Sequence, residues 1–173
     1  DGIRDYKVTG VQTCALPICF EGGIAHRLDT RTDGLMVVAR TPPFLQQLRA
    51  EFSEGRLRKF YRFESRGDVS FRKQRCTLAI AHHARKNDRM VVQKGSMSRH
   101  RGKWYPAWTE FSWLEGNTWE AEIRTGVMHQ IRVHAAAVGL PLDGDGIYGG
   151  AEAEFRLQHI GIKAEGWSFF LPV

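Results

Sequence analysis

Alternation between apolar and polar residues recurs along this chain and constrains its fold more than any other feature. The segment "RKFYRFESRG" (58–67) places Lys59, Tyr61 and Phe63 on one side of a predicted strand. The segment "TWEAEIR" (118–124) alternates in the same way. Because such segments outnumber those with a helical period, the residues predict a mixed α/β domain with only a few helices.

Other segments are also expected to form strands. The run "LMVVAR" (35–40) is short, apolar and β-branched, which is typical of a buried strand preceded by a polar loop. Strands are further predicted at 75–80, 89–94 and 107–114, the last pairing antiparallel with 118–124 across "EGN". The basic segment "KGSMSRHRGK" (94–103) is expected to be a loop, either mobile and solvated or in contact with nucleic acid phosphates.

Two segments have the period of a helix. In 41–55, Thr41 can cap the first turn, Pro42 suits that turn, and Gly55 fits the stop. Its predicted inward face carries Leu45, Leu48 and Phe52. The second helix is predicted over 127–139, with Met128, Ile131, Ala135 and Val138 inward and Gly139 at its end.

The first eighteen residues lack a helical or strand period and also lack the features of a signal peptide. Back-translated with suitable codons, they resemble a common sequencing-library adapter, whose variable index falls on Tyr6 and Lys7. We therefore expect 1–18 to be a non-native leader and 19–173 to be one domain truncated at its N-terminus. The alternative is a disordered natural tail.

The basic balance of the chain predicts a polyanion or an acidic surface as its partner. The formal net charge is +6 and the isoelectric point is about 9.5. Lys and Arg side chains gain affinity for nucleic acid by releasing counterions from phosphates, although many basic proteins bind none.

Cysteine usage indicates a reducing, cytoplasmic setting. Of the three cysteines, only Cys76 lies outside the leader and its junction, so no internal disulfide is expected. No cysteine or histidine spacing suggests a zinc site, and no apolar run approaches the ~18 residues of a membrane span.

Asp29 is the first candidate for chemistry, in the stretch "HRLDTRTDGLMVVAR". It lies in a polar turn between Arg27 and Arg31. A carboxylate in this place either caps the turn or is a reactive group at the rim of a sheet.

The second candidate stretch is "RTGVMHQIRVHAAAVGLPLDGDGIYGG". His129 and Arg132, at i and i+3, are predicted to project from the same side of a helix. An arginine facing a carboxylate would keep it ionised and oriented. Alternatively, Arg132 is an ordinary surface arginine and His129 a structural hydrogen-bonding residue.

Taken together, these stretches resemble the RluA-type RNA pseudouridine synthases. "HRLDTRTDGLM" is similar to the family's H-R-L-D-x-x-T-S-G-L-L, with Asp33 in place of Ser and Met36 in place of Leu. "TGVMHQIRVH" and "GLPLDGDGIYG" resemble its second motif, with Val127 where Arg is usual. A K-x-Y element at Lys59 and Tyr61, an A-x-T element at 107–109 and a closing strand at 155–172 extend the similarity from residue 26 to residue 172.

The resemblance implies the pseudouridine synthase catalytic-domain fold: an α+β domain with a mainly antiparallel mixed sheet flanked by a few helices. It implies that Asp29 is the catalytic aspartate, Tyr61 the tyrosine against the target base, and Arg132 the arginine paired with the aspartate. The implied reaction cuts the C1′–N1 bond of a uridine, turns the base and joins C5 to C1′. A carboxylate suits this isomerisation, and neither metal nor organic cofactor is needed.

The implied partner is ribosomal or transfer RNA, with the target base out of its stack. The candidates for substrate contact are Arg27, Arg31, Lys59, His129, Arg58 and the 94–103 segment. We expect no membrane partner, no obligate protein partner and a monomer. The rival interpretations are a catalytically silent RNA-binding relative, which the intact set of Asp29, Tyr61 and Arg132 disfavours, and a basic structural protein.

Members of this family have one or two strands before the H-R-L-D motif, where this chain carries the leader. Absent strands would leave a sheet edge exposed. We therefore predict that the 173-residue chain unfolds at low temperature without a sharp transition, measured by circular dichroism. A sharp cooperative melt would contradict this prediction.

Overall fold

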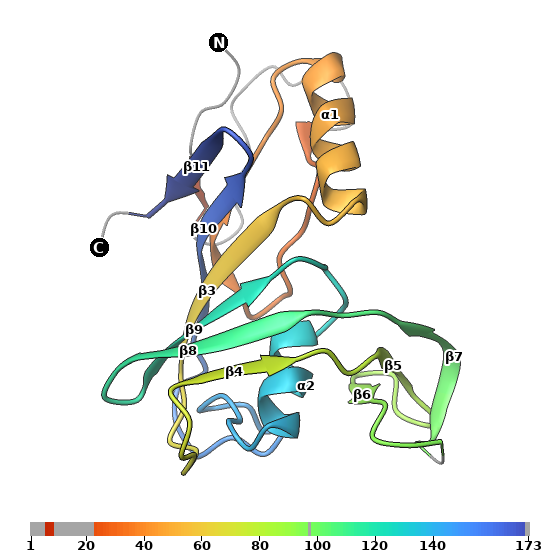
Figure 1. Ribbon diagram of the computed structural model, residues 1–173, viewed down its shortest axis with the longest axis vertical. Coiled ribbons are helices and arrows are strands. Elements are labelled where there is room, and N and C mark those ends of the chain that lie inside the picture. Colours follow the sequence, from red (N-terminus) through yellow and green to blue (C-terminus); the bar gives the residue numbers. More distant parts are fainter. Residues whose placement is uncertain (1–5, 9–22, 97, 172–173) are drawn as a thin grey trace.

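The computed structural model describes residues 6–8, 23–96 and 98–171. Its elements in chain order are β1 (Tyr6–Val8), β2 (Asp33–Met36), α1 (Pro42–Ser53), β3 (Arg58–Glu64), β4 (Lys73–Cys76), β5 (Ile80–His83), β6 (Met90–Val92), β7 (His100–Tyr105), β8 (Thr109–Glu115), β9 (Thr118–Ile123), α2 (Gln130–Ala137), β10 (Leu157–Ala164) and β11 (Trp167–Phe170). Figure 1 shows a long twisted sheet with α1 near one end, and with α2 and a smaller sheet near the other.

The main sheet has eight strands in the order β1-β2-β10-β3-β9-β8-β4, and β11 pairs with β10. Within the described residues, β10 and β2 are its parallel pair, and its other pairs are antiparallel. The predicted fold class, a mainly antiparallel mixed sheet with a few helices, is therefore confirmed. The smaller sheet has the order β6-β5-β7.

Helix α2 lies between the two sheets because it is apolar on more than one side. Ile131 and Ala135 pack into the core of the main sheet, which contains Phe111. Val133 packs with Ile80 and Met90 of the small sheet. Burial of these side chains against both sheets holds the N-terminus of α2 beside β3, where the site is formed.

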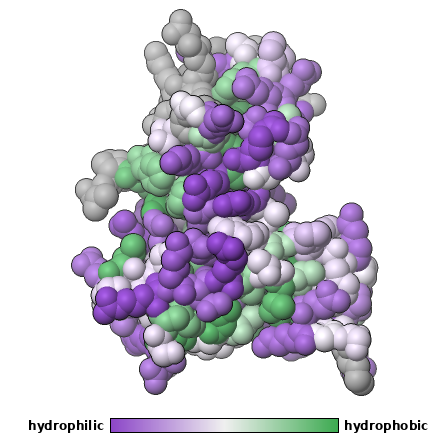
Figure 2. Space-filling view, in the orientation of Figure 1, coloured by the Kyte–Doolittle hydropathy of each residue, from purple (hydrophilic) through white to green (hydrophobic). Residues whose placement is uncertain are grey.

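Helix α1 covers the other end of the main sheet. Leu45 and Leu48 pack against Val37 and Ile162, as the predicted inward face requires. The helix begins at Pro42 and is followed by Gly55, which has a φ of +67°. In Figure 2, hydrophilic side chains cover most of the visible face, and a hydrophobic area lies beside β11, where Phe170 is 49% exposed.

Several predicted boundaries are wrong for identifiable reasons. Residues 75–80 do not form one strand, because the chain leaves β4 of the main sheet and enters β5 of the small sheet. The predicted loop 94–103 includes the start of β7, which pairs with β5. The closing segment is a hairpin of β10 and β11 rather than one strand, with Gly166 at φ +81° in its turn.

Other predictions about the elements are confirmed. Strands β8 and β9 pair antiparallel across the predicted turn. Lys59 and Tyr61 share one side of β3, whereas Phe60 contacts Phe170 of β11. Of the predicted leader, Tyr6–Val8 form β1 along the edge of β2, and the other residues of 1–18 lie outside the described part of the chain.

Gly34 is required where β2 approaches β10. Its φ is +112°, and a Cβ atom there would lie 2.2 Å from the carbonyl oxygen of His159. Both the backbone conformation and the close approach exclude a side chain. Gly34 thus holds the end of the Asp29 loop against the central strands.

We predict that Gly34→Ala lowers the free energy of unfolding by at least about 2 kcal/mol, because the new methyl group forces β2 and β10 apart. Urea unfolding followed by fluorescence measures this change. Gly95→Ala is the matched control, since a Cβ there meets nothing within 4 Å. Equal stability of the two variants would contradict the assignment.

Candidate functional site

A cavity of about 420 Å³ lies between the Asp29 loop, strand β3 and the N-terminus of α2. Six of the eight residues predicted for the site line it: Arg27, Asp29, Lys59, Tyr61, His129 and Arg132. Arg58 does not line it, and its guanidinium pairs with Glu122. Arg31 does not line it either. It lines a second cavity of about 570 Å³ together with Asp33 and Arg156, and its guanidinium lies 4.3 Å from the centre of the Phe155 ring.

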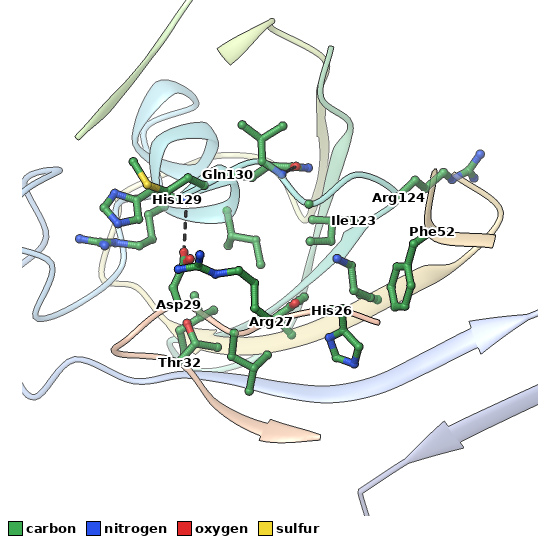
Figure 3. Close-up of a pocket in the computed structure, with 18 of the residues that line it drawn as sticks. His26, Arg27, Asp29, Thr32, Phe52, Ile123, Arg124, His129 and Gln130 are labelled. Atoms are coloured by element: carbon green, nitrogen blue, oxygen red, sulfur yellow. Dashed lines mark hydrogen bonds between the residues drawn. The ribbon is translucent and has the colours of Figure 1, made fainter. Parts of the chain in front are cut away.

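Asp29 begins a tight turn, in which the amide of Thr32 donates to the Asp29 carbonyl oxygen at 2.8 Å. Its carboxylate does not cap this turn among the described residues. Instead, Oδ2 accepts a hydrogen bond from the backbone amide of His129 at 3.2 Å. Figure 3 shows the two residues facing each other at one end of the cavity, while His26, Phe52 and Arg124 lie toward the other end. Of the two interpretations of Asp29, the geometry favours a group presented to the cavity.

His129 has an unusual backbone conformation. Its φ of +54° is positive, and among the described residues other than glycine it is alone in this. The predicted helix over 127–139 therefore begins only at Gln130, with His129 as its N-cap. Asp29 lies beside this helix N-terminus, where the aligned peptide dipoles favour a negative charge.

Arg132 has a different partner from the one expected. The sequence suggested a pair with Asp29, but Nε and Nη2 of Arg132 donate to the two carboxylate oxygens of Asp145 at 2.6 and 2.7 Å. Arg132 is 4% exposed and Asp145 is fully buried, so each needs the other as a counter-charge. Burial is the largest single influence and lowers the pKa of Arg132, but the hydrogen bond to Asp145 and the charges of Asp145 and Asp29 together outweigh it, so the pKa is raised.

Tyr61 is held by a stack of aromatic rings beneath the cavity. Its ring stacks on His159 with centroids 4.7 Å apart, and His159 contacts His26, which contacts Phe52. Burial lowers the pKa of His26 to about 3 and that of His159 to about 4, so both rings are neutral near pH 7. Burial and the nearby Asp29 charge raise the pKa of Tyr61, which keeps its hydroxyl protonated.

Lys59 is a buried cation on the cavity wall. It is 6% exposed, and its ammonium lies 5.3 Å from the centre of the Phe52 ring. Within the described residues it has no hydrogen-bond or ion-pair partner. Burial lowers its pKa from 10.5 to about 8, although the charge of Asp29 opposes this shift. A cation in such a place is available to an anion that enters the cavity.

Gln130, Asp145 and Tyr148 shape the site and were not predicted. Gln130 is 3% exposed and accepts hydrogen bonds from the Thr125 hydroxyl at 2.8 Å and from the Val127 amide at 3.1 Å. These bonds fold the turn before α2. The polar residues Asp145 and Tyr148 within the glycine-rich "GDGIYGG" were the available signal, but their partners are distant in the sequence.

Neither helix of the described chain is long and apolar enough to cross a membrane. The described residues contain no cluster of three or more His, Cys, Asp or Glu side chains arranged to hold a metal ion.

Comparisons with known proteins agree on one family. Residues 19–137 match the RNA pseudouridylate synthase family. Over 134 residues the chain is 34% identical to "RNA pseudouridine synthase 2, chloroplastic" of Oryza sativa subsp. japonica, covering 76% of this chain and 30% of that protein. Over 131 residues it is 37% identical to "Ribosomal large subunit pseudouridine synthase D" of Neisseria meningitidis serogroup A, covering 73% of this chain and 33% of that protein.

Solved structures share the fold. "Human RNA Pseudouridylate Synthase Domain Containing 1" superposes with a TM-score of 0.72 at 24% identity, covering 90% of this chain and 70% of that chain. The chain spans about a third of the length of the two sequence relatives named above. With the family match over residues 19–137 and this shared fold, the chain belongs to the RluA-type RNA pseudouridine synthase family.

Proposed function

We propose that this protein isomerises a specific uridine in ribosomal or transfer RNA to pseudouridine, with Asp29 as the catalytic carboxylate. One observation carries the proposal: the Asp29 carboxylate faces a cavity of about 420 Å³ whose wall includes Tyr61 and the buried Lys59, which has no ion-pair partner among the described residues. Cavities of this size commonly hold small ligands. The printed name of the Neisseria relative, a synthase of the large ribosomal subunit, supports ribosomal RNA.

In the proposed reaction the C1′–N1 bond breaks, the base turns within the cavity, and C5 forms a bond to C1′. C5 then loses its hydrogen to solvent and N1 gains a proton, so the product is an isomer of the substrate. Asp29 either attacks the nucleotide or stabilises positive charge that develops on the sugar. Neither a metal nor an organic cofactor takes part in the proposed reaction.

Tyr61 and Arg132 have supporting roles in this proposal. The neutral Tyr61 ring, fixed from below by His159, offers a face against which a uracil can pack. Arg132 acts on Asp29 through its charge rather than through a direct bond, since its hydrogen bonds go to Asp145. His129 and Arg27 line the cavity and are proposed to contact the substrate.

RNA outside the cavity is proposed to contact the small sheet. Strand β7 lies at the edge of that sheet and exposes Arg101 and Lys103. On the same strand, the rings of His100 and Trp104 contact each other, with their centroids 4.2 Å apart. Cations interleaved with aromatic rings suit phosphates and unstacked bases. Arg31 lies outside the catalytic cavity, so its proposed contact is with phosphate at the neighbouring surface.

We also propose that residues 19–173 form the catalytic domain and that residues 1–18 are foreign to it. We propose a cytoplasmic setting because Cys76 is the single cysteine outside the leader and its junction. We propose a monomer because of the resemblance to the family. The printed name of the rice relative places that protein in the chloroplast.

We expect the wild-type chain to release tritium from unmodified cellular RNA labelled at uridine C5, and Asp29→Ala to lower the rate by at least roughly 10³-fold. The loss follows because no other carboxylate lines the cavity among the described residues. Asp33→Ala is the matched control, since Asp33 lines the other cavity and should retain activity. No release by a folded wild-type protein would favour a silent RNA-binding relative.

We predict that Lys59→Met stabilises the protein by roughly 3 to 4 kcal/mol at pH 7, because burial lowers the pKa of Lys59 from 10.5 to about 8 and each unit of pKa depression costs ~1.4 kcal/mol. Below pH 8, Lys59 is charged in both the folded and unfolded chain, so the cost of burial is fully present. Between pH 8 and pH 10.5 the folded protein loses the proton first, and the advantage of the variant shrinks. Urea unfolding at pH 7 and pH 10 measures this difference.

The same variant tests the proposed phosphate contact. Lys59→Met should weaken RNA binding and reduce the slope of log affinity against log salt by about one. Lys163→Met removes an exposed lysine from β10 and is the control for both measurements. Unchanged RNA affinity in a more stable Lys59→Met protein would exclude Lys59 as a substrate contact.

A further inference from the structure

The Asp29 carboxylate is oriented by a backbone group rather than by the expected arginine. The amide of His129 donates to Asp29 from a left-handed backbone conformation, with φ +54° and ψ +20°. Residues with a Cβ atom adopt this backbone conformation at an energetic cost, so other contacts must hold His129 in it.

Tyr148 supplies such a contact. Its hydroxyl lies 3.0 Å from Nδ1 of His129 and shares a hydrogen bond with it. The same hydroxyl accepts a hydrogen bond from the backbone amide of Met90 in β6 at 2.8 Å. A continuous set of hydrogen bonds therefore runs from the small sheet through Tyr148 and His129 to Asp29.

The position of Tyr148 is itself fixed from its other side. Asp145 Oδ1 accepts hydrogen bonds from the amides of Ile147 and Tyr148 at 3.1 and 3.4 Å. The Arg132 guanidinium lies 5.1 Å from the centre of the Tyr148 ring. The ring is thus held independently of its hydroxyl, which allows the hydroxyl to be removed alone.

We propose that Tyr148 is a positioning residue, which holds His129 in the left-handed conformation that directs its amide to Asp29 and so ties the orientation of the carboxylate to strand β6. The kinetic part of this inference rests on the proposed function. The structural part, that the hydrogen bond between the Tyr148 hydroxyl and His129 holds the backbone of His129, does not depend on catalysis.

Tyr148→Phe removes the hydroxyl and keeps the ring. We expect kcat for tritium release to fall about tenfold, the worth of one hydrogen bond, with KM for RNA changed less than about twofold. Ser53→Ala is the control for the loss of one hydroxyl, because the exposed Ser53 hydroxyl donates to the carbonyl oxygen of Ala50 within α1 at 2.9 Å and Ser53 lines neither cavity. Equal kcat in the wild type and Tyr148→Phe would overturn the proposal.

Two substitutions of His129 separate the backbone from the imidazole. Both variants lose the imidazole and whatever contact it makes with the substrate, so the comparison between them isolates the backbone. Glycine adopts positive φ without strain, so His129→Gly keeps the amide directed at Asp29, and its kcat should exceed that of His129→Ala by about tenfold. Adding Tyr148→Phe to His129→Gly should cause no further loss, because the two act through one bond.

Equal kcat for glycine and alanine at position 129 would show that the backbone conformation does not matter, and the proposal would be wrong. A readout without catalysis covers failure of the proposed function. In the wild-type protein, hydrogen exchange of the His129 amide followed by NMR should be slow because the Asp29 carboxylate accepts its hydrogen, and Tyr148→Phe should speed this exchange at least about tenfold. Equal exchange rates of this amide in the wild type and in Tyr148→Phe overturn the inference, whether or not tritium is released.

Discussion

The buried ion pair between Arg132 and Asp145 is the interaction on which the geometry of the site depends. It joins α2 to the glycine-rich segment that follows it, and both partners are almost completely removed from solvent. Breaking such a pair leaves an uncompensated charge and costs about 3–5 kcal/mol. Asp145 also accepts the amide hydrogen of Tyr148, and Tyr148 in turn contacts His129 and strand β6. The carboxylate of Asp29 is thus oriented at the end of a series of contacts that begins with this pair.

The site retains groups that a stable core would not contain. Lys59 is buried with no hydrogen-bond or ion-pair partner in the described part of the chain, although the Asp29 charge lies near it. His26 and His159 are kept neutral by burial, and each has a ring nitrogen without a partner among the same residues. Each of these groups has an energetic cost in the folded state. Their common location around Tyr61 indicates that they serve the shape and charge of the cavity rather than stability.

Much of the fold was predictable because local pattern and tertiary environment agree. The alternation along β3 and β9 matches a sheet with two different faces, and the inward positions of α1 face one hydrophobic cluster. The errors occur where the surroundings change within one segment. Between β4 and β5 the chain passes from one sheet to the other, and at His129 the backbone adopts a conformation that no helical period predicts.

The sequence by itself determined the mixed fold, most of the helical and strand segments and six of the residues that line the cavity, because these follow from residue spacing and from motifs that lie close along the chain. Only the tertiary structure decided the partners of the charged groups. Arg132 is 103 residues from Asp29 and 13 from Asp145, and no spacing rule chooses between two carboxylates that the fold brings near the same guanidinium. Burial made that choice: the fully enclosed Asp145 requires the cation, whereas Asp29, at the cavity wall, is held by a backbone amide and remains open to a substrate.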